Sequence, residues 1–207
     1  MKNQYNFVAP FYRLISTIVF GNTILDAQKS LIKKLPQEGN LLVIGGGNGD
    51  ILPFIFDHAP RLNIMYVEAS TTMISLAKKK AGHNPLVHFH HSDDFTYPIF
   101  SSDYVLAPFV LDLFSPEKII EIISKIDNST GTSPAWYICD FDSQKVQHAT
   151  IYQKIKIKLT ILFFRVFTKH PLNHLPDIFS VFKTLGYRPK AISKSDFDLI
   201  NYEVFEK

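Results

Sequence analysis

The chain has 207 residues, a formal net charge of +3 and one cysteine, Cys139. This length predicts a single domain over residues 1–207 whose core needs no disulfide for stability. A lone cysteine excludes an intramolecular disulfide and favours a reducing compartment. With no apolar run near the roughly 20 residues of a membrane span, and no signal-peptide pattern, we expect a cytoplasmic protein.

The first 36 residues are predicted to form a helical N-terminal arm. Their apolar side chains recur at helical spacing over residues 3–35, with interruptions at Pro10 and at Gly21–Asn22. The pattern ends at Pro36, which cannot continue a helix.

An apolar run that leads into four glycines stands at residues 41–50, with the sequence LLVIGGGNGD. It predicts a buried strand, a tight turn and the start of a helix, an arrangement that brings backbone N–H groups to a ligand. The glycine spacing is G-x-G-x-G, and Asp50 stands where a dinucleotide fingerprint has its last small residue. This departure counts against NAD or FAD as the ligand.

From residue 41 to residue 142, apolar strand-like segments alternate with helical patterns. Such alternation predicts right-handed βαβ units and a parallel sheet, which binds ligands at the carboxyl ends of its strands. Glu68 ends the second strand and is placed to accept hydrogen bonds from both hydroxyls of a ribose. We expect strands at about 41–45, 63–68, 86–91, 102–107 and 135–140, helices at about 49–59, 71–81 and 115–127, and one helical turn within 92–101.

The C-terminal third departs from this alternation. Apolar residues at helical spacing predict a helix over 145–168, and a second helix is expected from Pro176 to Leu185, ending at Gly186. Residues 187–194 and 198–206 are predicted to form two strands of a closing antiparallel hairpin.

Positive charge is concentrated in residues 143–190, which hold nine Lys and Arg residues against one acid, Asp177. The segment is also rich in aromatic residues, so we expect 143–186 to form a helical cap that suits an apolar or aromatic acceptor. Contact of 145–168 with a membrane surface is a second interpretation of this charge, and a solvated helix face is a third.

These features together resemble the class I S-adenosylmethionine-dependent methyltransferases of the small-molecule type. The resemblance rests on the glycine loop, on Glu68, on the segment 87–95 and on the strand-like segment 102–108, and it covers about residues 40–142. It implies an α/β fold, Rossmann-like and doubly wound, with a mostly parallel seven-stranded sheet, a C-terminal antiparallel hairpin and helices on both faces. It also implies S-adenosyl-L-methionine as the cofactor and a small molecule as the substrate.

The resemblance further implies which residues bind the cofactor. An acidic residue after the third strand, best matched by Asp93, meets the adenine amino group in that family, and the N-terminal arm with its aromatic residues closes over the cofactor. The candidate cofactor-binding residues are Gly45, Gly46, Gly47, Gly49, Glu68, Ala69, Asp93, Asp94, Ala107, Pro108, Tyr5 and Tyr12. Because Glu68 ends a strand inside a crevice, we expect its replacement to weaken cofactor binding and to change stability little.

Three residues that follow the fourth and fifth strands are candidates for catalysis: Asp112, Asp140 and His148. Methyl transfer depends largely on alignment of the acceptor with an already activated methyl group. A general base is needed only if the acceptor must lose a proton, so the role of each candidate stays open.

A metal site is not expected. His88 and His90 share one face of the predicted third strand, whereas His91 points to the other, and metal coordination needs ligands that converge.

Three alternatives to small-molecule methyl transfer remain. Val43 stands where the family often has an acid, and with Gly46 it keeps aminopropyl transfer of the spermidine-synthase type open, although the helical residues 3–35 do not provide the β-rich domain of those enzymes. A non-catalytic nucleoside-binding protein is a second alternative. Nucleic-acid modification is disfavoured, because Ala107-Pro108-Phe109-Val110 stands where a base-handling N-P-P-[FY] motif would follow the fourth strand.

Overall fold

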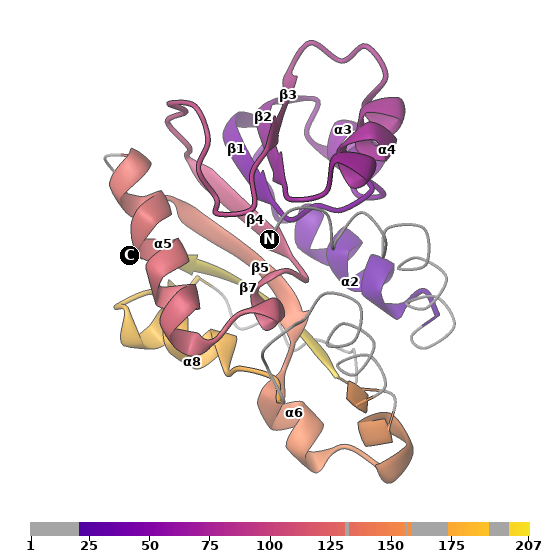
Figure 1. The fold of residues 1–207 in the computed structure, drawn as a ribbon, viewed down its shortest axis with the longest axis vertical. Helices are drawn as coiled ribbons and strands as arrows, with labels where there is room; N and C mark the ends of the chain where they lie inside the picture. Colours follow the sequence, from indigo (N-terminus) through magenta and orange to yellow (C-terminus); the bar gives the residue numbers. More distant parts are fainter. Residues whose placement is uncertain (1–20, 131–132, 156, 159–173, 191–198) are drawn as a thin grey trace.

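The computed structural model describes residues 21–130, 133–155, 157–158, 174–190 and 199–207. Its strands form one seven-stranded sheet in the order β3-β2-β1-β4-β5-β7-β6 (Figure 1). The first five strands are parallel, and β7 runs antiparallel to both β5 and β6. The strands are β1 (Glu38–Ile44), β2 (Arg61–Glu68), β3 (Val87–His91), β4 (Tyr104–Pro108), β5 (Ala135–Phe141), β6 (Arg188–Pro189) and β7 (Ile200–Glu206). This order confirms the predicted mostly parallel, doubly wound sheet with antiparallel strands at its C-terminal end.

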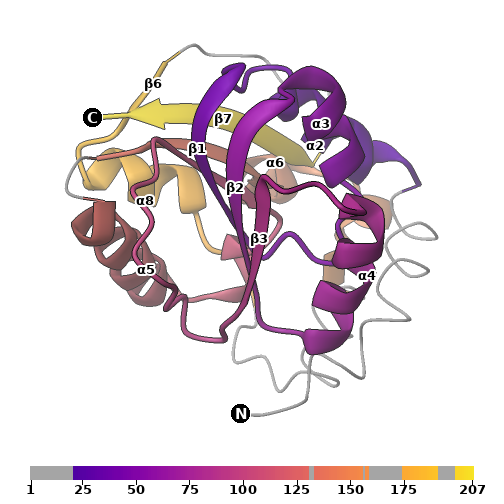
Figure 2. The ribbon, with the colours of Figure 1, turned by 90° about the horizontal axis from the view of Figure 1, so that it is seen from above.

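Helices cover both faces of the sheet, as predicted (Figure 2). One face packs against α2 (Thr23–Ile32), α3 (Leu52–His58) and α4 (Thr71–Ala81), and the other against α5 (Pro116–Thr130) and α8 (Ile178–Thr184). The strand β1 shows why its sequence is an unbroken apolar run. Leu41 and Val43 pack into the first of these cores, and Leu42 and Ile44 pack into the second.

The helix boundaries follow from capping side chains. The Ser70 hydroxyl accepts a hydrogen bond of 3.2 Å from the Met73 amide and begins α4. The Asp142 carboxylate caps α6 (Ser143–His148), and the Asp177 carboxylate caps α8. The helix after the glycine turn begins at Leu52, three residues later than predicted, because residues 49–51 still belong to the turn.

Two of the predicted elements are wrong in detail. No helical turn forms in 92–101, which is irregular throughout. The helix predicted over 145–168 is interrupted, because α6 ends at His148 and Ala149 is extended with ψ 157°. The chain is helical again at 151–155 and 157–158.

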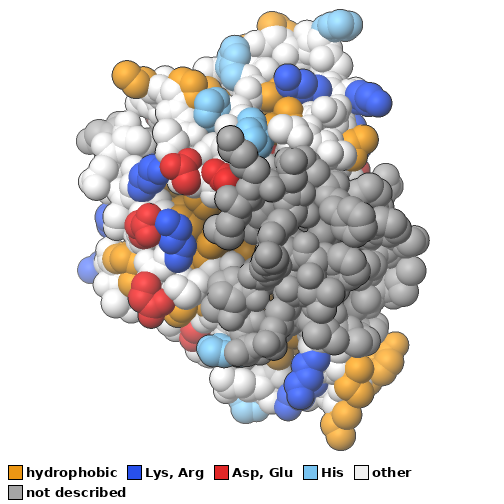
Figure 3. All heavy atoms as spheres, viewed as in Figure 1, with side chains coloured by type: hydrophobic (Ala, Val, Ile, Leu, Met, Phe, Trp, Pro, Cys, Tyr) orange, Lys and Arg blue, Asp and Glu red, His pale blue; other side chains and the backbone are white. Residues whose placement is uncertain are grey.

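The helical residues 151–155 do not bury the apolar stripe that the sequence predicts. Ile151, Tyr152 and Ile155 are 80%, 67% and 50% exposed, whereas Ile157 is buried in the core. Figure 3 shows hydrophobic side chains that project at the lower right of the molecule beside Lys or Arg side chains.

Several predictions fall outside the described residues. These are the N-terminal arm before residue 21, with Tyr5 and Tyr12, the part of the cap at 159–173, and the predicted strand segments within 191–198. Within the described part of the chain, every helix is too short or too polar to cross a membrane.

Candidate functional site

The glycine turn after β1 is packed tightly against three neighbouring elements. A side chain at Gly45 would overlap Val110, and one at Gly46 would overlap the Tyr66 hydroxyl. A Cβ at Gly49 would lie 2.7 Å from the Cα of Ala77 in α4. Gly45, Gly46 and Gly49 therefore serve the packing of the turn.

Gly47 differs, because a Cβ there would meet no atom of the described residues within 4 Å. Its φ of +64° is one that residues with a side chain rarely adopt. Its peptide groups are fixed by two side chains of β2: the Gly47 N–H donates to Glu68 Oε2 at 3.0 Å, and the Tyr66 hydroxyl donates to the Gly47 carbonyl at 3.0 Å. Of these four glycines, Gly47 is the one whose Cα side is open for a ligand to approach.

Glu68 joins the glycine turn to the start of α4. Its Oε1 accepts a hydrogen bond of 2.9 Å from the Ser70 amide, while Oε2 accepts from Gly47. The side chain is only 9% exposed, and this burial raises the pKa of the Glu68 carboxyl, although the amides of Ser70, Gly47 and Ala69 act in the opposite direction. A carboxylate has about four acceptor positions, so the two amides leave room for two further donors.

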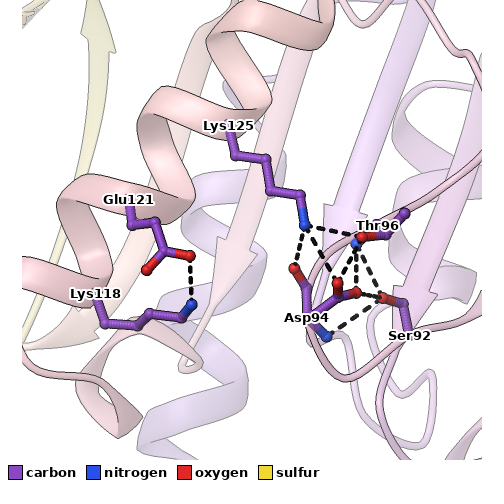
Figure 4. Close-up of polar contacts among 6 residues, drawn as sticks. All are labelled: Ser92, Asp94, Thr96, Lys118, Glu121 and Lys125. Atoms are coloured by element: carbon purple, nitrogen blue, oxygen red, sulfur yellow. Dashed lines mark hydrogen bonds and ion pairs between the residues drawn. The ribbon is translucent and has the colours of Figure 1, made fainter.

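The acidic residues after β3 differ in their surroundings (Figure 4). Asp94 accepts hydrogen bonds from the Ser92 hydroxyl, from the amide and hydroxyl of Thr96, and from Lys125 of α5. The Thr96 and Ser92 donors hold the pKa of the Asp94 carboxyl well below its usual range. Asp94 therefore closes the loop onto α5, where Lys118 and Glu121 form a separate pair.

Asp93, by contrast, is exposed at the carboxyl end of β3. Its side chain makes no hydrogen bond or ion pair within the described residues, so its carboxylate remains available to a ligand. Ala69, which follows Glu68, is half-buried, and its carbonyl accepts a hydrogen bond of 2.9 Å from His91 Nε2.

The end of β4 turns sharply toward the end of β5. Ala107 and Pro108 are buried, and Phe109 adopts φ +57°, an unusual conformation for a bulky residue. The Phe109 amide donates to the Cys139 carbonyl at 2.8 Å, and the Phe109 ring lies 5.3 Å from that of Phe141. These contacts hold the turn in its strained form.

The same turn brings two of the catalytic candidates together. Asp112 lies in a 3₁₀ turn (Leu111–Leu113), and its amide donates to Asp140 Oδ2 at 3.3 Å. Asp140 is fully buried at the end of β5, and its Oδ1 accepts from the Phe141 amide at 2.8 Å. The third candidate, His148, is exposed at the end of α6 and makes no hydrogen bond to either carboxylate within the described residues.

Sequence reasoning missed Tyr66 and Phe109. Tyr66 occupies a fully buried position of β2, where its ring predicts only packing, and nothing in the sequence signals that its hydroxyl reaches the glycine turn. The described residues contain no group of three or more His, Cys, Asp or Glu that could hold a metal ion.

Residues 42–131 match a family model described as a methyltransferase domain. No curated protein sequence matches the chain significantly.

Solved structures similar to the chain include a mitomycin 7-O-methyltransferase, with a TM-score of 0.73 at 14% identity, covering 99% of this chain and 60% of that one. Human N-acetylserotonin methyltransferase, solved with S-adenosylmethionine, has a TM-score of 0.68 at 12% identity, covering 100% of this chain and 59% of that one. The chain thus spans less than two thirds of these two proteins. The DhpI complex has a TM-score of 0.69 at 11% identity, covering 98% of this chain and 94% of that one.

At these identities the structural similarity establishes the fold, and the family model covers the segment that contains the glycine turn, Glu68 and the turn after β4. Two of these similar structures, human N-acetylserotonin methyltransferase and DhpI, are solved with S-adenosylmethionine. Residues 42–131 thus match a methyltransferase domain, and the chain has the fold of S-adenosylmethionine-dependent methyltransferases.

Proposed function

We propose that the chain binds S-adenosylmethionine at the carboxyl ends of β1, β2 and β4 and transfers its methyl group to a small apolar or aromatic acceptor. This proposal rests on one hydrogen bond, which the Gly47 N–H donates to the Glu68 carboxylate. It joins the glycine that is open to a ligand to the carboxylate that would bind the ribose. Strand order reverses between β1 and β4, which is where sheets of this kind bind their ligands.

Each part of the site has a distinct task in this proposal. Glu68 accepts hydrogen bonds from the ribose hydroxyls with its remaining acceptor positions, and Asp93 accepts one from the adenine amino group. Gly47 lets the ligand approach the backbone, while Ala107 and Pro108 form an apolar wall at the end of β4. When bound, the cofactor supplies a methyl group on a positively charged sulfur.

Titration calorimetry with S-adenosylmethionine, S-adenosylhomocysteine and NAD tests cofactor binding. We expect dissociation constants in the micromolar range for the first two, which corresponds to roughly −7 to −8 kcal/mol, and no heat with NAD. Decarboxylated S-adenosylmethionine is the control for aminopropyl transfer and should bind more weakly. Heat with NAD alone would refute the assignment.

Methyl transfer is tested with S-adenosylmethionine labelled in the methyl group and phenolic acceptors. Apigenin is a suitable first acceptor, because an O-methyltransferase family 2 protein from Planctomyces limnophilus is solved in complex with it. Label in an organic extract, dependent on both the acceptor and Glu68, supports an apolar acceptor. Cofactor binding without transfer to any acceptor would favour a non-catalytic binding protein.

A further inference from the structure

Asp112 and Asp140 form a pair of carboxyl groups on the β4–β5 side of the site. Glu68, on the β2 side, would receive the ribose, so the opposite side is left for the reacting end of the cofactor and the acceptor. The pair is held by the backbone, since Asp112 donates its amide to Asp140 and the Phe109 turn is bonded to β5. Its geometry therefore does not depend on a ligand.

One oxygen of this pair has no partner. Asp112 as a residue is partly exposed, but its Oδ1 is buried and accepts no hydrogen bond from the residues that the structure describes. A buried carboxylate oxygen without a donor is costly, and such an atom in a binding site indicates a missing ligand or a missing proton.

The charges around the pair indicate that the missing partner of Asp112 Oδ1 is a proton. Burial raises the pKa of Asp112 to about 7, and burial together with the charge of Asp112 raises the pKa of Asp140 well above its usual range. No positive side chain among the described residues contributes to either shift. On the adjoining helix, Lys145 donates to the Ile200 carbonyl, and on β5 the buried Cys139 thiol adds no positive charge. Two such neighbouring carboxyls cannot both ionise freely.

We propose that Asp112 and Asp140 share an exchangeable proton, release it when the positive sulfur of the cofactor binds, and then accept the proton of a hydroxyl acceptor. This inference rests on the proposed function and narrows it to acceptors whose methylated atom is a protonated oxygen. The cofactor would thus convert the pair into a general base before the acceptor reacts.

Methyl transfer forms one bond and breaks another. The acceptor oxygen forms a bond to the methyl carbon, the carbon–sulfur bond breaks, and its electron pair stays on the sulfur. The hydroxyl proton passes to the Asp112 carboxylate. The positive charge on sulfur and the negative charge of the pair are thereby both neutralised.

The experiment measures proton release when the cofactor binds, and it does not depend on methyl transfer. Calorimetric binding enthalpies of S-adenosylmethionine at pH 7 are compared in phosphate and Tris, buffers with different ionisation enthalpies, to give the number of protons released. S-adenosylhomocysteine is the matched control because it lacks the methyl group and the positive charge. A group with a pKa near 7 is about half protonated at pH 7, and a nearby opposite charge lowers such a pKa by roughly 1–3 units, so we expect release of about half a proton with the first ligand only.

Two substitutions identify the residue that releases the proton. Asp112→Asn should abolish the difference between the two ligands, whereas Asp142→Asn, a carboxylate that only caps α6, should preserve it. In the unaltered protein the release from Asp112 should disappear at pH 9, where Asp112 is already ionised, which gives an independent check if Asp112→Asn folds poorly. Equal proton release with both ligands, or full release in folded Asp112→Asn, would overturn the inference while leaving cofactor binding intact. Absence of heat with either ligand would instead remove the proposed function, and this inference with it.

Discussion

Contrary to the expectation from its position at a strand end, replacement of Glu68 should affect the fold as well as the ligand. The side chain is 9% exposed and accepts hydrogen bonds from two backbone amides, those of Gly47 and Ser70. Each hydrogen bond to a charged group contributes about 1.5–3 kcal/mol, and relief of the buried charge returns part of this sum. We therefore expect Glu68→Ala to lower the free energy of unfolding by roughly 2–3 kcal/mol, and Glu68→Gln, which keeps one acceptor oxygen, by about half as much.

Urea denaturation and thermal melting measure this loss. For a chain of this size, 2–3 kcal/mol corresponds to a decrease in Tm of roughly 5–10 °C. Glu38→Ala is the matched control, because Glu38 is an exposed strand carboxylate paired with Arg61 and should cost less than about 1 kcal/mol. If Glu68→Ala melted like the unaltered protein but bound no cofactor, the reasoning about the glycine turn would be wrong and Glu68 would act on the ligand alone.

Three further predictions concern other parts of the molecule. Gly49→Ala should cost about 2–4 kcal/mol of stability because its Cβ meets α4, whereas Gly47→Ala should cost about 1–2 kcal/mol and abolish cofactor binding; melting and calorimetry separate the two. Tyr187→Phe should cost about 1–2 kcal/mol in urea denaturation, since the buried hydroxyl donates to Asp127 at 2.6 Å. Because folding raises the pKa of Asp112, the folded protein keeps a proton that the unfolded chain releases near pH 4, and the free energy of unfolding should therefore fall as the pH rises from about 4 to 7. Asp112→Asn should reduce this slope, and an unchanged slope would contradict the assignment.

The fold was largely predictable because its strands are buried on both faces. Such strands appear in the sequence as short apolar runs, and the crossover helices between them carry caps at Ser70 and Ser115 that mark where they begin. The interruption at Ala149 was missed because apolar spacing continues across it. The signal was present nonetheless: Thr150 and Gln153 exchange side-chain-to-amide hydrogen bonds in a capping box, the T-x-x-Q pattern that begins a new helix.

The site was predictable only in part. The proximity of the glycine turn to Glu68 could be predicted, because their spacing reflects the length of one strand–helix–strand unit. The hydroxyl of Tyr66 could not, since a tyrosine in an apolar strand has no sequence feature that reveals its partner. Asp112 and Asp140 were each placed after a strand, but their pairing depends on the left-handed conformation of Phe109, which sequence patterns do not disclose for a residue other than glycine.

The position of β7 has a consequence for how the protein is synthesised. β7 is formed by residues 200–206, yet it lies between β5 and β6 and pairs with β5 over six residues. Trp136, the single tryptophan of the chain, is fully buried opposite Phe205 in this pairing, so its fluorescence should report a late step of refolding. Native-like fluorescence in a chain truncated before β7 would argue against this order. Until residues 200–206 leave the ribosome, one edge of β5 is unpaired and apolar, and this edge exposes the nascent chain to aggregation.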